Sequence, residues 1–166
     1  MDDAAKKTAL RMIPYGIYIL TAKSGDNIAA ATVNWVTQTA FEPPLVAVGV
    51  KTDSGAYGLI KETKSFALNM LGKGQQGVGF TFFKPAELDG DKISGEPFTA
   101  GENGAPILSN AIASVECKVT DIVEQGDHHI VVGQVTAANV AKQPDGRPDE
   151  AILEMKDLGD KVFYGG

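Results

Sequence analysis

The sequence has few of the residues that form covalent or metal cross-links. Its 166 residues include one cysteine, Cys117, and two histidines. A single cysteine excludes an internal disulfide and any cysteine-based zinc or iron–sulfur cage within one chain. No apolar run approaches the ~20 residues of a membrane span, and the first residues lack the cationic-then-apolar order of a signal peptide. We therefore expect a reduced, cytoplasmic protein without a membrane partner.

Basic residues are also in the minority, with 15 Lys and Arg against 21 Asp and Glu and a net charge of −6. Proteins that bind nucleic acid or anionic membranes need basic surface, so neither partner is expected. The hydrophobic fraction of 43% and the charged fraction of 22% are those of an ordinary globular protein. At this length we expect one domain, residues 1–166.

Short β-branched and aromatic runs separated by turn residues predict strands. The predicted strands are 15–22, 28–33, 45–50, 65–71, 114–120 and 128–140, and residues 154–164 are a candidate for one more. The predicted helices are 2–12, 53–62 and 75–83. Residues 84–106, rich in Asp, Gly and Pro, are expected to form a long irregular excursion. This pattern predicts a mainly β protein, a β-barrel with short helical insertions.

Several buried positions follow from the same pattern. Residues 45–50 are apolar or glycine throughout and are expected to be buried on both faces. Residues 34–44 match neither the helical nor the strand period of hydrophobicity. Alternation in residues 114–120 turns Cys117 inward, as a small hydrophobic residue rather than a nucleophile. The aromatic residues expected in the core are Phe66, Phe80, Phe82 and Phe83.

Three motifs resemble chemical sites but are not assigned to them. Residues 72–77 match G-x-G-x-x-G, yet no second strand ending in an acidic residue follows, so a strand-to-helix turn is the better interpretation. His128 and His129 are neighbours on a strand and point to opposite faces, which excludes a shared metal ion. We expect one of them to face a pocket, where Asp127 fixes its tautomer, and the other to face solvent. No G-x-S-x-G nucleophile motif is present.

Two polar segments flank the apolar run 45–50. Residues 32–37 (TVNWVT) offer backbone groups and short polar side chains suited to the edge of a flat heterocycle. Residues 51–55 (KTDSG) combine a lysine, two hydroxyls and a helix N-terminus, which suits a phosphate. Each segment alone is equally typical of a polar strand end or a capped helix. Their succession in one chain favours a nucleotide-like ligand.

At these residues the chain resembles the flavin reductase-like family, whose members have an FMN-binding split barrel. The matching blocks, in the expected order, are residues 14–21, 31–37, 41–48, 54–61, 66–71 and 126–135. The resemblance implies a homodimer that binds one flavin per subunit near the dimer interface, FMN in the first place and FAD as the alternative. The residues that it places along the flavin ring are Thr32, Asn34, Trp35, Val36 and Thr37. Those that it places at the ribityl chain and phosphate are Lys51, Thr52, Ser54 and Tyr57.

The resemblance implies further roles on neighbouring strands. Asn69 is expected to face the flavin cavity, and Asp127 and His128 to bind NAD(P)H, with His128 as the catalytic-site residue nearest the substrate. Trp35 replaces a small residue of many relatives, so its indole is expected to crowd or stack against the nicotinamide. His129 stands where relatives often have Thr or Ala.

These residues lead to two functional hypotheses. The first is an NAD(P)H:flavin oxidoreductase, in which hydride passes from nicotinamide to flavin. The alternative is an electron-transfer flavoprotein, flavoredoxin-like, that exchanges electrons with a protein partner such as a rubredoxin. The acidic surface and Trp35 are consistent with the alternative. A flavin carrier without redox turnover is a third possibility.

Overall fold

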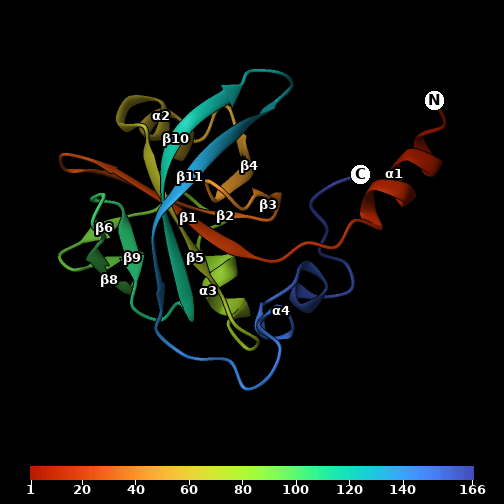
Figure 1. Ribbon diagram of the computed structural model, residues 1–166. Helices are drawn as coiled ribbons and strands as arrows, with labels where there is room; N and C mark the ends of the chain where they lie inside the picture. Colours follow the sequence, from red (N-terminus) through yellow and green to blue (C-terminus); the bar gives the residue numbers. More distant parts are fainter.

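Antiparallel strands are the main secondary structure of the computed structural model, which describes residues 1–166. The helices are α1 (Asp3–Arg11), α2 (Gly55–Thr63), α3 (Gln76–Thr81), α4 (Pro148–Ala151) and the 3₁₀ helix η1 (Met155–Leu158). The strands are β1 (Tyr18–Ser24), β2 (Asn27–Val33), β3 (Val36–Ala40), β4 (Leu45–Lys51), β5 (Ser65–Met70), β6 (Leu88–Asp89), β7 (Lys92–Ile93), β8 (Glu96–Ala100), β9 (Pro106–Leu108), β10 (Ala113–Val123) and β11 (His128–Val140). Figure 1 shows the long strands of the larger sheet curling around one another, with the small sheet that contains β6, β8 and β9 to one side.

The larger sheet is a split barrel. Its seven strands follow the order β2-β1-β5-β10-β11-β4-β3, and all neighbours are antiparallel. The two edge strands, β2 and β3, are consecutive in the chain and are joined only by Asn34 and Trp35. The sheet therefore curls until its edges approach each other at this junction, although β2 and β3 form no ladder. The predicted mainly β split barrel with short helical insertions is confirmed.

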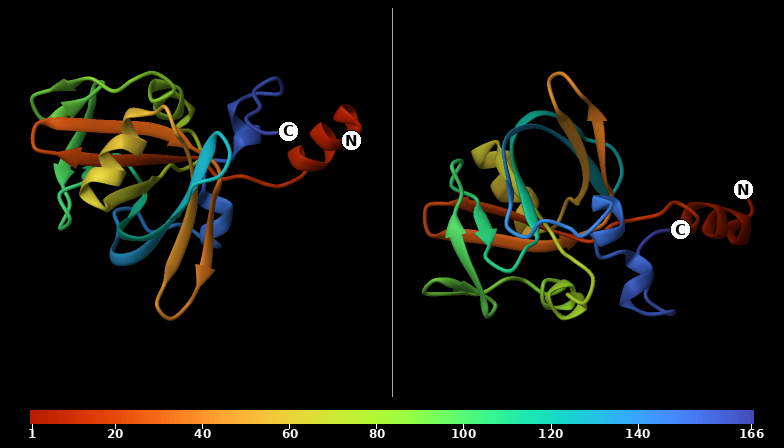
Figure 2. Two further views of the ribbon diagram at one scale, coloured as in Figure 1. Left: turned by 90° about the horizontal axis from the view of Figure 1, so that it is seen from above. Right: turned by 60° about the horizontal axis from the view of Figure 1, so that its bottom comes forward.

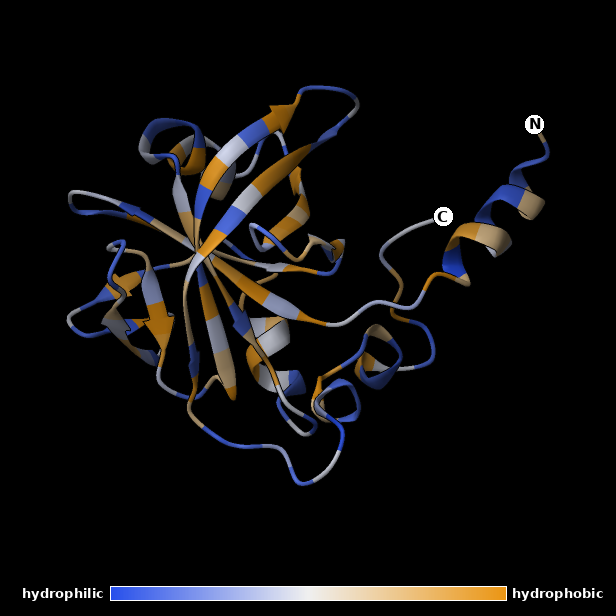
Figure 3. Cartoon of the chain, in the orientation of Figure 1, coloured by the Kyte–Doolittle hydropathy of each residue, from blue (hydrophilic) through white to orange (hydrophobic).

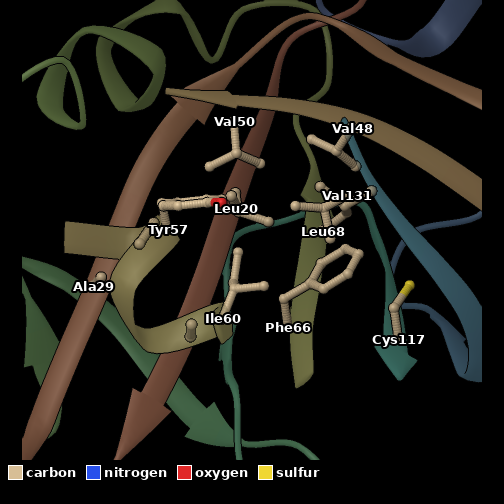
Figure 4. Packing of buried hydrophobic residues seen from close by; sticks show 12 residues of the cluster. Leu20, Ala29, Val48, Val50, Tyr57, Ile60, Phe66, Leu68, Cys117 and Val131 are labelled. Atoms are coloured by element: carbon tan, nitrogen blue, oxygen red, sulfur yellow. The ribbon is translucent and has the colours of Figure 1, made fainter. Parts of the chain in front are cut away.

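One core cluster fills the barrel. It includes Phe66, Leu68, Val131 and Cys117, all with at most 1% of their surface exposed, and Figure 4 shows them lying together beneath α2. Along β10 and β11, hydrophobic and hydrophilic residues follow each other in bands (Figure 3), because one face of this hairpin packs inward. Burial raises the pKa of the Cys117 thiol to about 12. Cys117 is therefore the buried, unreactive residue that the alternation predicts.

Helix α2 begins and ends where the sequence predicts. Ser54 caps it, with its Oγ accepting a hydrogen bond from the Tyr57 amide at 3.2 Å. The helix ends at Lys64, which adopts the left-handed conformation with φ 56°. Because Ser54 follows β4 directly, the capped end of α2 lies at the end of that strand.

Four expectations about the fold are wrong. Residues 36–40 form the edge strand β3, which pairs with β4 through a register shift that hides its periodicity. Only Val48 and Val50 of β4 are fully buried, because the β3–β4 hairpin projects from the sheet (Figure 2). The excursion 84–106 contains β6, β7 and β8, which form a small sheet with β9. The last segment makes η1 and two isolated bridges instead of a strand.

The termini leave the sheet on the same side (Figure 1). No residue of α1 is buried, and the helix projects away from the barrel. The segment Gly159–Gly166, here called the C-terminal tail, returns toward the β2–β3 junction without forming a strand or helix. Phe80 and Phe83, expected in the core, are 41% and 55% exposed, whereas Phe66 and Phe82 are buried as predicted.

Candidate functional site

Two hollows open where β2 leads into β3. The inner hollow has a volume of about 390 Å³, and the predicted site residues that line it are Thr32, Asn34, Lys51, Ser54 and His128. The outer hollow has a volume of about 700 Å³, and the predicted site residues that line it are Trp35, Val36, Thr37, Asp127 and His128. The structure thus brings most of the predicted residues to one end of the barrel. It divides them between two hollows that share His128.

The end of β2 supplies the polar wall of the inner hollow. Asn34 is only 5% exposed, and its Nδ2 donates a hydrogen bond to the Tyr164 carbonyl at 3.0 Å. The Thr32 hydroxyl donates to the Gly79 carbonyl at 2.6 Å, and the Thr32 amide donates to the Phe82 carbonyl. These bonds fix both side chains at the point where the strand leaves the sheet.

Trp35 lies between the two hollows and the C-terminal tail. Its ring packs over Gly49 of β4, where an added Cβ would lie 3.0 Å from the indole. The ring centroids of His128 and Tyr164 are 4.7 and 5.4 Å from that of Trp35. The indole Nε1 is buried and has no hydrogen-bond partner. An unpaired buried donor of this kind identifies a position where a ligand acceptor is missing.

Lys51 and the start of α2 form the cationic end of the inner hollow. Lys51 pairs with Asp53 at 3.2 Å, but both side chains are more than half exposed. Such a pair contributes little, so the ammonium group remains free to turn toward an anion. The amides of Gly55 and Ala56, in the first turn of α2, donate no hydrogen bond within the chain. Together these groups are suited to a phosphate.

His128 is held by two partners. Its Nδ1 lies 2.9 Å from Asp127 Oδ1, and its Nε2 lies 2.7 Å from Tyr164 Oη. Because a carboxylate only accepts, Nδ1 donates to Asp127, and Nε2 shares the second hydrogen bond with the Tyr164 hydroxyl. The bond from His128 holds the pKa of Asp127 below its ordinary value, and burial raises the pKa of Tyr164. The expected role of Asp127 in fixing the tautomer agrees with this geometry.

Three predicted residues line neither hollow: Asn69, Thr52 and Tyr57. Asn69 is fully buried beside β9, where its Oδ1 accepts from the Leu108 amide at 2.8 Å and its Nδ2 donates to the Ile19 carbonyl. The prediction that Asn69 faces the flavin cavity is therefore wrong, because its side chain lines neither hollow and hydrogen-bonds to β1 and β9 instead. Thr52 is committed to the Asp127 carbonyl, at 3.2 Å from its hydroxyl.

Tyr57 points away from the inner hollow as well. Its hydroxyl bonds to His129 Nδ1 and contacts Glu124, which in turn pairs with Lys61 at 2.6 Å. The hydrogen bond from Lys61 lowers the pKa of Glu124. His129, expected in solvent, is instead partly buried against the Tyr57 ring. This cluster fastens α2 to the β10–β11 hairpin.

Some residues of the inner hollow escaped prediction. They are aromatic and aliphatic side chains from the end of α3 and from the C-terminal tail: Phe82, Phe83, Val162, Phe163 and Tyr164. The apolar run 162–164 (VFY) was the only sequence signal that this segment packs against the rest of the protein. Its contact with β2 spans more than a hundred residues, which no local pattern encodes.

No group of three or more His, Cys, Asp or Glu side chains is placed to hold a metal ion. None of the helices combines the length and the apolar character needed to cross a bilayer.

Comparison with known proteins identifies relatives over most of the chain. Residues 10–156 match the family model described as the flavin reductase like domain. Diflavin flavoprotein A 1 of Synechocystis is 36% identical over 141 residues, which are 84% of this chain and 25% of that protein. The chain spans about a quarter of the length of the diflavin flavoproteins that it matches.

Two solved structures share both fold and sequence with this chain. SgcE6 of Streptomyces globisporus, an NADH:FAD oxidoreductase, is 29% identical with a TM-score of 0.68, over 77% of this chain and 71% of that one. The same protein is also known in complex with NAD and FAD fragments. BorF, the flavin reductase component of a bacterial two-component tryptophan halogenase, is 26% identical with a TM-score of 0.73, over 92% and 91%.

Proposed function

The chain belongs to the flavin reductase-like family, and on that premise we propose that it binds FMN and reduces it with NAD(P)H. One observation carries the proposal: the polar side chains of β2, the lysine that ends β4, the cap of α2 and His128 of β11 converge on the inner hollow. These groups come from four separate segments of the chain. Their convergence is what a ligand with a flat polar ring and an anionic tail requires.

The inner hollow fits such a ligand in size and in chemistry. Its volume of about 390 Å³ lies in the range of roughly 300–1,000 Å³ that is typical of small-molecule sites. Apolar walls from Val33, Val50 and Phe82 suit a tricyclic ring, and the Asn34 amide suits the polar edge of that ring. Lys51 and the first amides of α2 would hold the phosphate.

A bound flavin would supply the redox chemistry, with hydride passing from C4 of the nicotinamide to N5 of the flavin. The protein contributes orientation and the exclusion of water. His128, with its tautomer fixed by Asp127, would hold the nucleotide and transfer no proton. Trp35 would support one side of the nicotinamide through its ring face.

An absorbance experiment tests the proposal. The purified protein, loaded with FMN, is mixed with NADH or NADPH in the absence of oxygen, and the oxidised flavin band is followed by stopped flow. Rapid bleaching with at least one nucleotide is expected. Bleaching by dithionite but by neither nucleotide would retire the reductase and leave the electron-transfer flavoprotein.

That second function rests on a specific observation. The relatives named diflavin flavoproteins contain the matching region as about a quarter of a longer chain, so the region also occurs within larger flavoproteins. A protein partner such as a rubredoxin would then exchange electrons with the flavin. The homodimer implied by the family resemblance stays a prediction.

Replacing His128 with alanine separates the two binding sites. The variant is expected to raise the KM for NAD(P)H by about two- to tenfold, the loss of one ordinary hydrogen bond, while the FMN content stays unchanged. Steady-state kinetics and the flavin-to-protein absorbance ratio measure the two effects. Loss of FMN from the variant would show that His128 holds the flavin and that the two sites are misassigned.

A further inference from the structure

The C-terminal tail lies across a groove at the end of the barrel. Its residues Val162, Phe163 and Tyr164 line the inner hollow, and Gly165 and Gly166 line the outer hollow. A third hollow, of about 390 Å³, lies between the tail, η1 and the segment after α1. Neighbouring hollows share lining residues with one another. The tail is thus the partition that divides one longer groove into three compartments.

The tail makes the hydrogen bond to His128 and the ring contact with Trp35 that a substrate would need. Tyr164 takes the Nε2 atom of His128, and Asp127 takes Nδ1, so neither ring nitrogen is available to a ligand. The Tyr164 ring also packs against the Trp35 ring, at 5.4 Å between centroids. An aromatic ring with a polar substituent therefore already lies where the proposed function places the nicotinamide and its carboxamide.

Few contacts hold the tail in this place. Asn34 donates to the Tyr164 carbonyl, Arg11 Nε donates to the Gly165 carbonyl at 3.2 Å, and the Arg11 guanidinium lies 4.1 Å from the centroid of the Phe163 ring. Within the tail the only backbone hydrogen bond joins the Val162 amide to the Gly159 carbonyl. Tyr164 is 48% exposed. A segment with so few buried contacts opens at low cost.

With the tail in this place, one polar group of the site, Trp35 Nε1, still lacks a hydrogen-bond partner. Gly165 approaches Trp35 Nε1, since a Cβ built on it would lie 3.6 Å away, yet the indole donor finds no acceptor there. A buried donor without a partner destabilises the arrangement that creates it. A ligand that brings an acceptor to this position therefore gains an interaction that the tail does not make.

Resting on the proposed function, we propose that Tyr164 is an internal competitor of the nicotinamide nucleotide and sets the affinity of the site for it. The nucleotide binds after the tail leaves, and it then takes over the Nε2 atom of His128 and the face of Trp35. The apparent dissociation constant for the nucleotide equals the intrinsic constant divided by the fraction of molecules whose tail is open, so a mostly closed tail lowers the affinity. The turnover rate at saturating nucleotide is unaffected. The tail therefore acts on KM and leaves kcat unchanged.

Two variants test this competition. Tyr164→Phe removes only the hydroxyl that binds His128, and a truncation after Asp160 removes the tail from Lys161 onward. The KM for the reducing nucleotide is expected to fall at least threefold in Tyr164→Phe, with kcat within twofold of the parent. It should fall further in the truncated protein, which is assayed with saturating FMN because the truncation also removes Val162 and Phe163 from the wall of the inner hollow. Tyr18→Phe, which removes a half-buried hydroxyl outside the three hollows, is the matched control and should change neither constant. An unchanged or increased KM in both variants overturns the proposal, because the tail would then be a wall of the site.

A second measurement does not depend on turnover. Chymotrypsin cleaves after Phe163 and Tyr164, and mass spectrometry follows the shortened chain with and without oxidised NAD⁺, which cannot reduce the flavin. NAD⁺ is expected to accelerate cleavage several-fold because it displaces the tail. Accelerated cleavage without any bleaching by NADH or NADPH would refute the reductase but support the competition. Bleaching by NADH or NADPH, with no effect of NAD⁺ on cleavage and no change of KM in the variants, would support the reductase but refute the competition.

Discussion

Replacing Phe66 with alanine is expected to lower the free energy of unfolding by about 3–5 kcal/mol, the cost of removing a fully buried aromatic side chain. Phe66 lies on β5, between β1 and β10, and is 0% exposed. A Cβ built on Gly133 of β11 would lie 2.6 Å from the Phe66 ring and 2.9 Å from Cys117. The ring thus fills the space that this glycine leaves, and its loss opens a cavity in the middle of the barrel.

Urea denaturation followed by fluorescence of the single tryptophan measures this loss. Phe41→Ala is the matched control: its ring is 90% exposed, so the free energy of unfolding should change by less than about 0.5 kcal/mol. If the alanine variant does not fold, Phe66→Leu leaves a smaller cavity and should show a smaller loss in the same direction. Equal midpoints for Phe66→Ala and Phe41→Ala would contradict the placement of Phe66 in the core.

The sequence predicted those elements whose signals are local. The β1–β2 hairpin has turn residues between two apolar runs, α2 has Ser54 as its cap, and β11 spans residues 128–140 as expected. Each of these signals arises from contacts within a few residues. The barrel-like arrangement was expected because many short strands with only small helices are typical of β-barrels.

The errors arose where distant segments decide the outcome. β3 has a register shift against β4, and its exposed residues 37–39 carry no hydrophobic alternation. Short strands such as β6 and β7, of two residues each, exist only because β8 and β9 pair beside them. Phe83, just after α3, is exposed because it borders the inner hollow rather than the core.

The candidate site was predictable in part for the same reason. The ends of β2 and β4 are adjacent to the β3 hairpin in sequence, so their polar side chains were recognisable as one group. Asn69 was misplaced because its orientation depends on β9, almost forty residues later, whose Leu108 amide it binds. The role of Tyr164 was invisible, since its partners Asn34 and His128 lie far away in the sequence.

Replacing Lys51 with alanine is expected to weaken FMN binding by about 1–3 kcal/mol, roughly 5–150-fold in Kd, if its ammonium group meets the phosphate. Lys51 ends β4 and lines the inner hollow directly before the capped end of α2. Its only ion pair is with Asp53, an exposed neighbour that holds it weakly. Removal of the side chain therefore leaves the fold intact and removes one charge from the phosphate site.

Riboflavin, which has the same ring but no phosphate, makes this prediction specific. Quenching of flavin fluorescence gives both dissociation constants, and Lys51→Ala should weaken FMN while leaving riboflavin within about twofold. Lys92→Ala, which removes an exposed lysine from β7 in the small sheet, should change neither constant. Asp53→Asn should strengthen FMN binding slightly, because Lys51 no longer has a competing carboxylate beside it. Equal weakening of FMN and riboflavin would place Lys51 against the ring instead, and the phosphate would then require another cation.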